Sequence, residues 1–453
     1  MKRTTRRDFL RAAARGGAGL WMLPGLACRA RPGSASPLGR VHVAQIGCGR
    51  MGRTDTEGVL RSPLARVVAV CDLDAKRLAA GRELAEAFYR AQGEAAVSIR
   101  AYRDHRDLLA QEDVDAVVVS TPDHWHAQVA VDAALAGKHL YVQKPVTYDV
   151  AEAIALRTAV RAKGVVLQTG SQQRSEAPWP AFRVAAEAVR NGRVGRLTRI
   201  EIGLGTDAPS GRRPAPMTVP PELDFERWLG AAPEQPYMEG RVHPQDGFGR
   251  PGWITTEDFG LGMITNWGAH HVDIAQWAMG RELSGPLAVE ARADFMSDDL
   301  WTVHRGYHVE LEYPGDVRVI VDDALEVGLA FHGDEGSIFC TREGAEPLRA
   351  SAPELLAPLP ANATRFPPSR DHYENWLESV RAGHDPIAPV DQAARSLTAC
   401  YLAWLAMKLG RRLRWDPARE RFLDDPEADA RLRRKPRRVE YDALARLEVA
   451  GLA

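Results

Sequence analysis

The stretch "VAQIGCGRMG", from Val43 to Gly52, contains three glycines in the pattern G-x-G-x-x-G directly after an apolar run. Gly47 allows the chain to turn sharply, Gly49 lets the backbone approach a pyrophosphate, and Gly52 lets a helix pack closely on the strand. The N-terminus of that helix would point at the phosphates. Taken alone, the pattern also fits a tight structural turn, so the flanking sequence has to decide between the two.

The following segment favours a dinucleotide. The run "VVAVCDLD" ends the next apolar stretch in Asp72, 20 residues beyond Gly52. A carboxylate at this distance can accept both hydroxyls of the adenosine ribose and would repel a 2′-phosphate. The sequence therefore predicts NAD as the cofactor and makes NADP the less favoured one.

Short apolar runs alternate with helical stretches from Val41 onward, as a parallel sheet with crossover helices requires. "DAVVVST" is apolar on both faces, which suits a central strand covered by helices on each side. These patterns predict an N-terminal Rossmann domain with a doubly wound parallel sheet over residues 36–168. The expected strands are Val41 to Ile46, Ala65 to Cys71, Asp115 to Ser120, His139 to Val142 and Val165 to Thr169.

The alternation changes after about Gly170. A helix (Phe182 to Arg190) and a strand (Leu197 to Gly203) precede a long segment rich in Pro, Gly and Trp, from Asp207 to Gly260. Loops of that length are usually functional. Period-two patterning then predicts several strands between residues 287 and 339, and a long helix follows near the end of the chain. Residues 169–453 are expected to form an α/β domain with a large, mostly antiparallel open sheet, whose final helix is free to pack back on the first domain.

Residues 1–35 are predicted to be a signal and linker. Arg6 and Arg7 precede a weakly hydrophobic stretch rich in Ala, Gly and Leu, which is the layout of a twin-arginine export signal. The protein is therefore expected in the periplasm or otherwise exported, with Cys28 a weak candidate for a lipid anchor. No later apolar run is long enough to span a bilayer.

Charge and cysteine content exclude other classes of protein. The formal net charge is −1, so no overall field draws the protein to nucleic acid. The five cysteines have no metal-ligand spacing, and their odd number argues against a disulfide framework. His124 and His126 form an H-x-H pair without a nearby cysteine or acidic cluster, so no metal site is predicted.

Two motifs follow the predicted strands at the sheet edge where ligands bind in this fold. "STPDHWH" comes after one strand and "YVQKP" after the next. Lys144 in the second motif can hydrogen-bond a reacting oxygen and stabilise developing alkoxide charge, although a solvated surface lysine is the simpler interpretation.

Together, "GCGRMG", "STPDHWHA", "VQKP", "GSQQR" and "ITNWGAHHVDIAQW" resemble the motifs of the Gfo/Idh/MocA oxidoreductase family. The resemblance covers nearly all of the chain after the leader. It implies a Rossmann domain joined to an α/β domain whose open sheet forms one wall of a sugar site. It also implies a homo-oligomer, a dimer or tetramer, that acts on a small sugar or glycoside.

The resemblance implies catalytic roles for Lys144, His270 and Asn266. Lys144 matches the lysine of the family's E-K-P motif, where Gln143 replaces glutamate and should leave the lysine less firmly protonated. His270 matches the histidine of a D-x-G-x-H segment and is a plausible general base. Asn266 stands at the aspartate position and cannot accept a proton.

The remaining site residues are expected to bind the cofactor or the substrate. Adjacent helical residues point about 100° apart, so only one of His270 and His271 should face the nicotinamide. The expected substrate contacts are Arg174, Tyr237, Trp267 and His271. The expected cofactor contacts are Gly47, Gly49, Arg50, Met51, Asp72, Ser120, Thr121, Pro122, Trp125, His126, Gln143, Lys144 and Gln172.

The sequence thus predicts an NAD-dependent oxidoreductase that acts on a CH–OH group of a sugar, glycoside or polyol, with tightly bound cofactor. The alternative is an NAD-dependent glycoside hydrolase or lyase that works through transient oxidation of the sugar. Glycosidases related to the family commonly lack the E-K-P lysine, so Lys144 favours the oxidoreductase.

Overall fold

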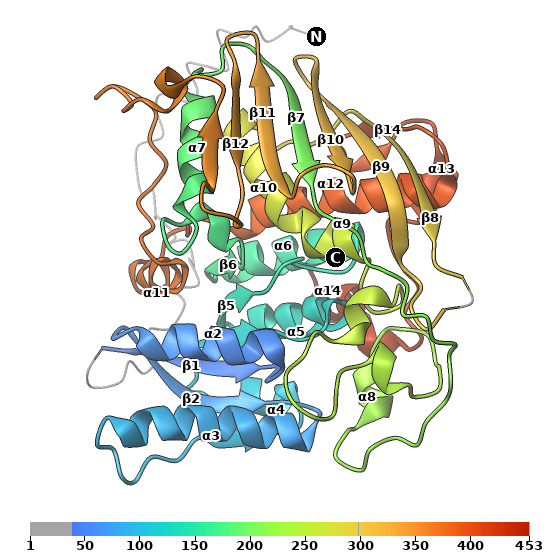
Figure 1. The fold of residues 1–453 in the computed structure, drawn as a ribbon. Helices are drawn as coiled ribbons and strands as arrows, with labels where there is room; N and C mark the ends of the chain where they lie inside the picture. The colour runs from blue at the N-terminus through green and yellow to red at the C-terminus, as the bar shows by residue number, and fades with distance from the viewer. Residues whose placement is uncertain (1–38, 298, 453) are drawn as a thin grey trace, which may run out of the picture.

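Residues 41–169 form a six-stranded parallel sheet and its helices (Figure 1). The computed structural model describes residues 39–297 and 299–452. The predicted export signal, with Arg6, Arg7 and Cys28, lies outside the described residues. The strand order is β3-β2-β1-β4-β5-β6, and every neighbouring pair is parallel, which confirms the doubly wound Rossmann sheet. The strands are β1 (Val41–Ile46), β2 (Ala65–Cys71), β3 (Arg100–Tyr102), β4 (Ala116–Val119), β5 (His139–Val142) and β6 (Leu167–Thr169).

Helices cover both faces of this sheet, and the central strand β4 is buried along its whole length. Its four residues "AVVV" have no polar member because neither face meets water. Three of the helices that follow the strands begin at capping aspartates: Asp74 for α3, Asp104 for α4 and Asp149 for α6. These helices are α2 (Arg50–Arg61), α3 (Ala75–Ala91), α4 (His105–Leu109), α5 (Asp123–Leu135) and α6 (Val150–Lys163).

The second sheet has nine strands and is largely antiparallel, as predicted. Its order is β13-β12-β11-β7-β10-β9-β8-β14-β15, and the neighbours β7 and β10 are its parallel pair. The strands are β7 (Leu197–Gly203), β8 (Ala288–Phe295), β9 (His304–Tyr313), β10 (Val317–Asp322), β11 (Gly328–Gly333), β12 (Ser337–Cys340), β13 (Leu348–Ala350), β14 (Leu413–Asp416) and β15 (Arg421–Phe422).

Helices α7 (Pro180–Arg190), α10 (Gly268–Met279) and α12 (Val390–Leu409) lie between this sheet and the Rossmann domain (Figure 1). Alternate residues of β9, among them Val309 and Leu311, are buried against these helices. The residues between them are more exposed, so the outer face of the sheet remains open. The large apolar core of the second domain therefore lies on the side of its sheet that faces the first domain.

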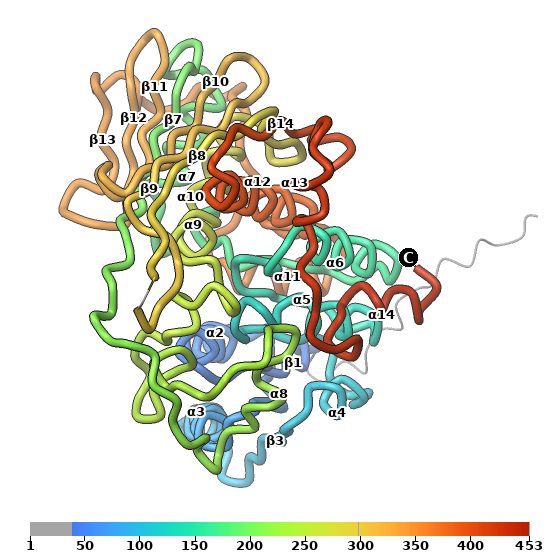
Figure 2. Tube along the Cα trace, turned by 90° about the vertical axis from the view of Figure 1, so that its right-hand side faces the viewer, coloured from blue at the N-terminus to red at the C-terminus, as the bar shows by residue number. Residues whose placement is uncertain are grey.

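The end of the chain returns to the Rossmann domain. After α13 (Pro426–Ala430) the tail descends beside α6, and α14 (Ala443–Val449) packs against α5 and α6 (Figure 2). An ion pair of 2.8 Å between Arg434 and Glu152 fixes the tail to α6. The final helix thus does pack on the first domain, an arrangement that the sequence left open.

The long segment between β7 and α9 (Met263–Asn266) contains the short helix α8 (Phe225–Leu229) and has no strand. It runs down the side of the molecule from the second sheet to the Rossmann domain (Figure 2). His124 and Trp125 at the start of α5 each make a 2.9 Å hydrogen bond to the carbonyl oxygen of Trp228 in α8. None of the helices in the described ranges is long and apolar enough to cross a bilayer.

Candidate active site

A cavity of about 530 Å³ lies at the carboxyl ends of the Rossmann strands, where residues from both domains line it. All thirteen residues predicted to bind the cofactor line this cavity, as do the three predicted catalytic residues. The cofactor group is Gly47, Gly49, Arg50, Met51, Asp72, Ser120, Thr121, Pro122, Trp125, His126, Gln143, Lys144 and Gln172.

The glycine loop fits a dinucleotide. Gly47 has a φ of 88°, and a Cβ on it would lie 2.6 Å from the carbonyl oxygen of Ser120. A Cβ on Gly52 would lie 1.8 Å from the carbonyl oxygen of Gly47, so a side chain there would separate the helix from the turn. At Gly49 the nearest atom would be Arg77 Nη1, 4.0 Å away. The backbone at Gly49 is therefore open to the cavity, as close approach of a pyrophosphate requires.

Asp72 is held in place by backbone donors. Its carboxylate accepts hydrogen bonds from the N–H of Cys48 at 2.7 Å and of Asp74 at 2.8 Å. Each oxygen keeps a free lone pair, so the group can still accept ribose hydroxyls. Burial raises the pKa of Asp72, although the two N–H donors oppose that shift.

Lys144 and Asn266 join the two domains at the cavity. Lys144 Nζ donates to the backbone carbonyl oxygen of Asn266 at 2.9 Å and lies 3.3 Å from its Oδ1. Burial lowers the pKa of Lys144 to about 8, and the charge of Asp123 opposes this shift. The lysine is therefore not an ordinary solvated surface residue.

Asp123 is a site residue that sequence reasoning did not select. It is the first residue of α5, lines the cavity and is buried. Burial raises its pKa to about 7, with Lys144 acting in the opposite direction. Two groups that titrate near neutral pH thus lie together in the cavity, a common property of catalytic sites. Asp123 belongs to the motif "STPDHWH", and its position after the carboxyl end of a strand could have identified it as a site residue.

A second buried carboxylate lies behind the Gln143–Lys144 motif. Gln143 Nε2 donates to Asp55 Oδ1 at 2.8 Å. Asp55 also accepts from Ser120 Oγ at 2.6 Å and from Tyr373 Oη at 2.7 Å, and burial raises its pKa to about 6. The lowered pKa of Lys144 agrees in direction with the expectation that Gln143 leaves the lysine less firmly protonated, although burial is its largest cause. The charge of Asp55 on α2 acts in the opposite direction and raises the pKa of Lys144.

His270 and His271 point in different directions, and of the two only His270 lines the cavity. Burial, followed by the charges of Arg342 and Lys144, holds the pKa of His270 well below its usual range, so the imidazole is neutral. His271 stacks on Phe182 with ring centroids 5.7 Å apart. The structure therefore places His271 in the core and not among the residues that line the cavity.

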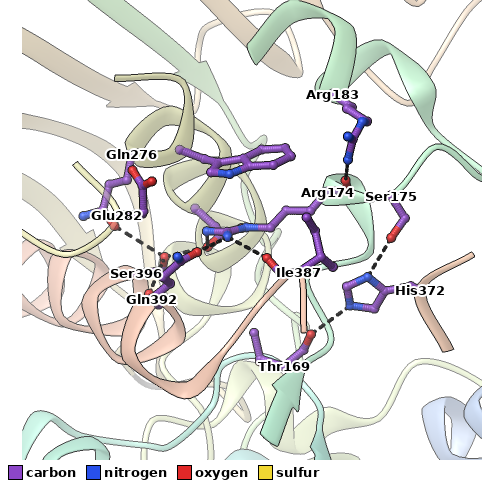
Figure 3. Close-up of polar contacts among 12 residues, drawn as sticks. Thr169, Arg174, Ser175, Arg183, Gln276, Glu282, His372, Ile387, Gln392 and Ser396 are labelled. Atoms are coloured by element: carbon purple, nitrogen blue, oxygen red, sulfur yellow. Dashed lines mark hydrogen bonds and ion pairs between the residues drawn. The ribbon is translucent and has the colours of Figure 1, made fainter. Parts of the chain in front are cut away.

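Arg174 does not line the cavity, contrary to its predicted substrate contact. Figure 3 shows its side chain among the residues that it contacts instead, including Ile387 and Gln392. Its guanidinium is fully buried and binds both oxygens of Asp273, at 2.6 and 2.7 Å. Ser396 Oγ donates to the same carboxylate at 2.8 Å. Arg174 thus joins helices α10 and α12 to the segment after β6, and the carboxylate of Asp273 is the ion-pair partner of Arg174.

Of the other two residues predicted to contact substrate, one lines the cavity and the other is buried elsewhere. Trp267 lines the cavity, whereas Tyr237 is buried in the core of the long segment with its ring 5.3 Å from that of Phe225. The ring nitrogens of His126 lie 2.7 and 2.9 Å from the carbonyl oxygens of Pro145 and Thr121.

No three His, Cys, Asp or Glu side chains are grouped as a metal site within residues 39–297 and 299–452.

Fold and cavity together define a two-domain oxidoreductase with a nucleotide-binding Rossmann domain. The chain belongs to the Gfo/Idh/MocA family. The family description "Oxidoreductase family, NAD-binding Rossmann fold" matches residues 41–171, and "Oxidoreductase family, C-terminal alpha/beta domain" matches residues 210–443.

Individual relatives are distant and only partly aligned. The uncharacterized oxidoreductase YrbE of Bacillus subtilis is 29% identical over 201 residues, which are 44% of this chain and 50% of the relative. The myo-inositol 2-dehydrogenase of Thermotoga maritima is 27% identical over 225 residues, 48% of this chain and 63% of the relative. The match thus spans between half and two thirds of each of these relatives.

Similarity to a solved structure extends over most of the chain. The WlbA dehydrogenase of Bordetella pertussis, in complex with NADH and UDP-GlcNAcA, superposes with a TM-score of 0.60 at 17% identity. The match covers 83% of this chain and 99% of that one. At this identity the similarity establishes the fold alone.

Proposed function

We propose that the protein oxidises a CH–OH group of a sugar, glycoside or polyol with a tightly held NAD. The observation that carries this proposal is the contact between Lys144 and Asn266, from two domains, at a cavity that Gly49 and Asp72 also line. A relative named for myo-inositol oxidation and a similar fold that holds NADH with a sugar nucleotide support a substrate of this kind.

The residues around this contact have complementary roles. The neutral imidazole of His270 would take the hydroxyl proton, and the ammonium of Lys144 would stabilise the negative charge that develops on the oxygen. Asn266 positions Lys144 through its backbone carbonyl. Bound NAD would supply the ring that accepts the hydride. Holding these groups around one carbon accounts for much of the rate increase.

The predicted export signal adds a constraint on turnover. We propose that Arg6 and Arg7 direct the folded protein out of the cytoplasm, where free NAD is not expected. A retained cofactor must then be reoxidised within the protein by a second substrate. Fractionation of cells that express the chain with Arg6→Lys and Arg7→Lys tests the export, and light scattering of the purified protein tests the proposed dimer or tetramer.

The activity is tested on protein purified with its cofactor. Free sugars, polyols and chromogenic glycosides are added in turn, and the absorbance of NADH and of the released aglycone is recorded. Stoichiometric reduction of NAD supports the oxidoreductase. Release of the aglycone without net NADH would overturn it in favour of the hydrolase or lyase that works by transient oxidation.

A further inference from the structure

Arg342 follows β12, and its side chain lines the cavity. Its Cζ lies over the ring of Trp179 at 3.6 Å from the centroid, and 4.9 Å from the centroid of Trp267. Two tryptophans thus hold the planar group in place by cation–π contacts. Lys144, Asn266 and both tryptophans line the same cavity, and the charge of Arg342 lowers the pKa of Lys144 and of His270, so Arg342 lies near the candidate catalytic groups.

A single amide fixes the direction of this side chain. With the Gln173 amide oriented so that both its polar atoms have partners, its oxygen accepts from Arg342 Nε at 3.0 Å. Its nitrogen then donates to the carbonyl oxygen of His270 at 3.1 Å. Gln173 therefore ties the guanidinium to the helix that carries the candidate base. Within the described part of the chain, the two Nη atoms have no protein acceptor, so they remain available to a ligand.

The charge of Arg342 has no carboxylate partner among the described residues. Burial is the one cause that shifts its pKa, which it lowers to about 10. Asp123, the carboxylate that lines the same cavity with Lys144, interacts electrostatically with that lysine, and no carboxylate contributes to the pKa shift of Arg342. Arg342 is half-buried, and a cation that is partly removed from water without a counter-charge is costly; the structure keeps this one beside the candidate catalytic groups. An anionic ligand would remove that cost.

We propose that Arg342 binds a carboxylate of the substrate, so that the protein acts on sugar acids such as uronates or aldonates. The two Nη atoms match a planar carboxylate in a bidentate pair, for which arginine is better suited than lysine. This inference rests on the proposed function, since it names the substrate class of the same site.

Binding of a carboxylate would also affect the chemistry. The charge of Arg342 contributes to the low pKa of both His270 and Lys144. A substrate carboxylate beside Arg342 would offset that charge and make the His270 imidazole a stronger base when substrate is present. A neutral sugar would leave the imidazole in its weakly basic state.

The test compares acids with their neutral counterparts on NAD-loaded protein. The probes are D-glucuronate against D-glucose, and D-gluconate against sorbitol, with glucose 6-phosphate as a phosphate probe. Quenching of tryptophan fluorescence measures binding, because Trp179 and Trp267 flank the guanidinium, and NADH absorbance measures turnover. We expect at least one acid to bind at least about tenfold more tightly than its neutral counterpart.

The variants are Arg342→Gln and Arg342→Lys. The first should lose about tenfold or more of the affinity for the acid and little of that for the neutral sugar, and the second should lie between it and the unchanged protein. Arg349→Gln is the matched control, because Arg349 is exposed on β13 and pairs with Glu326. Melting temperatures establish whether each variant is folded. If Arg342→Gln does not fold, the comparison is made with Arg342→Lys.

Each outcome bears on the inference. Acids that bind no better than neutral sugars, glucose 6-phosphate as the strongest ligand, or an Arg342→Gln variant with unchanged acid affinity would each overturn it. Failure of every probe to bind would do the same. Reduction of NAD by a neutral sugar, with no acid binding, would leave the oxidoreductase standing without the acid preference. Acid binding that depends on Arg342 without any NADH would support the acid site and reject the oxidoreductase.

Discussion

Lys144 Nζ donates a 2.9 Å hydrogen bond to the backbone carbonyl oxygen of Asn266, so the lysine of the first domain is held by the second. The nearer acceptor is a backbone atom, which any residue at this position would supply, and the Oδ1 of the side chain that replaces aspartate in the family motif adds a longer hydrogen bond of 3.3 Å. The cavity is completed only when the two domains are packed together. The position of the lysine is thus a property of the whole fold.

Replacing Lys144 by alanine should abolish the chemical step and leave the cofactor in place. We expect turnover to fall by about 100-fold or more, the usual effect of removing one group that stabilises a developing oxyanion. Stopped-flow measurement of NADH formation with saturating substrate checks this, and the NAD content of the purified variant checks retention. Lys163→Ala, at the exposed end of α6, is the control. Unchanged turnover in Lys144→Ala would reject the assignment.

The pH dependence of oxidation should follow the ammonium form of Lys144. Its pKa is lowered to about 8, so the charged form that stabilises the oxygen is present below this pH and is lost above it. The kcat/KM for oxidation should therefore fall as the pH rises through about 8. A rate that keeps rising through this range would instead make the neutral amine the proton acceptor.

Asp123 provides a second test of the same titration. Its negative charge raises the pKa of Lys144, against the larger effect of burial. Asp123→Asn should therefore move the alkaline fall in kcat/KM to a lower pH, and initial-rate profiles of the two proteins measure the displacement. An alkaline limb at the same pH in both proteins would contradict electrostatic coupling between Asp123 and Lys144.

The first domain was the more predictable one from sequence. Strands β1, β2 and β5 begin and end where sequence predicted, because most of their residues are apolar and buried, with His42, Gln45 and Arg66 as the polar exceptions inside β1 and β2. The edge strand β3, "RAY", was missed, since three residues with one arginine show no such pattern. Strands β13, β14 and β15 are also short, and β14 joins the sheet by pairing with β8, which lies far earlier in the chain.

The candidate site was predictable where a motif carried it. The glycine loop, the "STPDHWH" turn and the "VQKP" turn lie at strand ends, so topology alone brings their residues together. Arg174 was misassigned because its motif continues directly from a strand, whereas its partner Asp273 is 99 residues away in sequence. Arg342 gave no local signal, since only the packing of the second sheet brings it to the cavity.

Gly49 allows cofactor binding to be separated from folding. A Cβ at this position would have its nearest neighbour 4.0 Å away, so Gly49→Ala should fold with an unchanged melting temperature in the cofactor-free state. The added methyl group would occupy the space that a pyrophosphate needs, so we expect NAD affinity to fall by about tenfold or more. Calorimetric titration of stripped protein with NAD measures this. Gly52→Ala is the contrast, because its Cβ would collide with Gly47 and the fold itself should suffer.

The buried pair of Arg174 and Asp273 should contribute to stability and not to substrate binding. Both side chains are essentially unexposed, at 0% and 1%, so Asp273→Asn leaves a buried guanidinium without its counter-charge. Breaking such a pair costs about 3–5 kcal/mol of unfolding free energy. Denaturant unfolding of the purified variant measures the loss. Glu326→Gln, which breaks the exposed pair with Arg349, should change it by less than about 1 kcal/mol. An Asp273→Asn protein that kept its stability but lost affinity for substrate would contradict this assignment and support a substrate-binding role for Arg174.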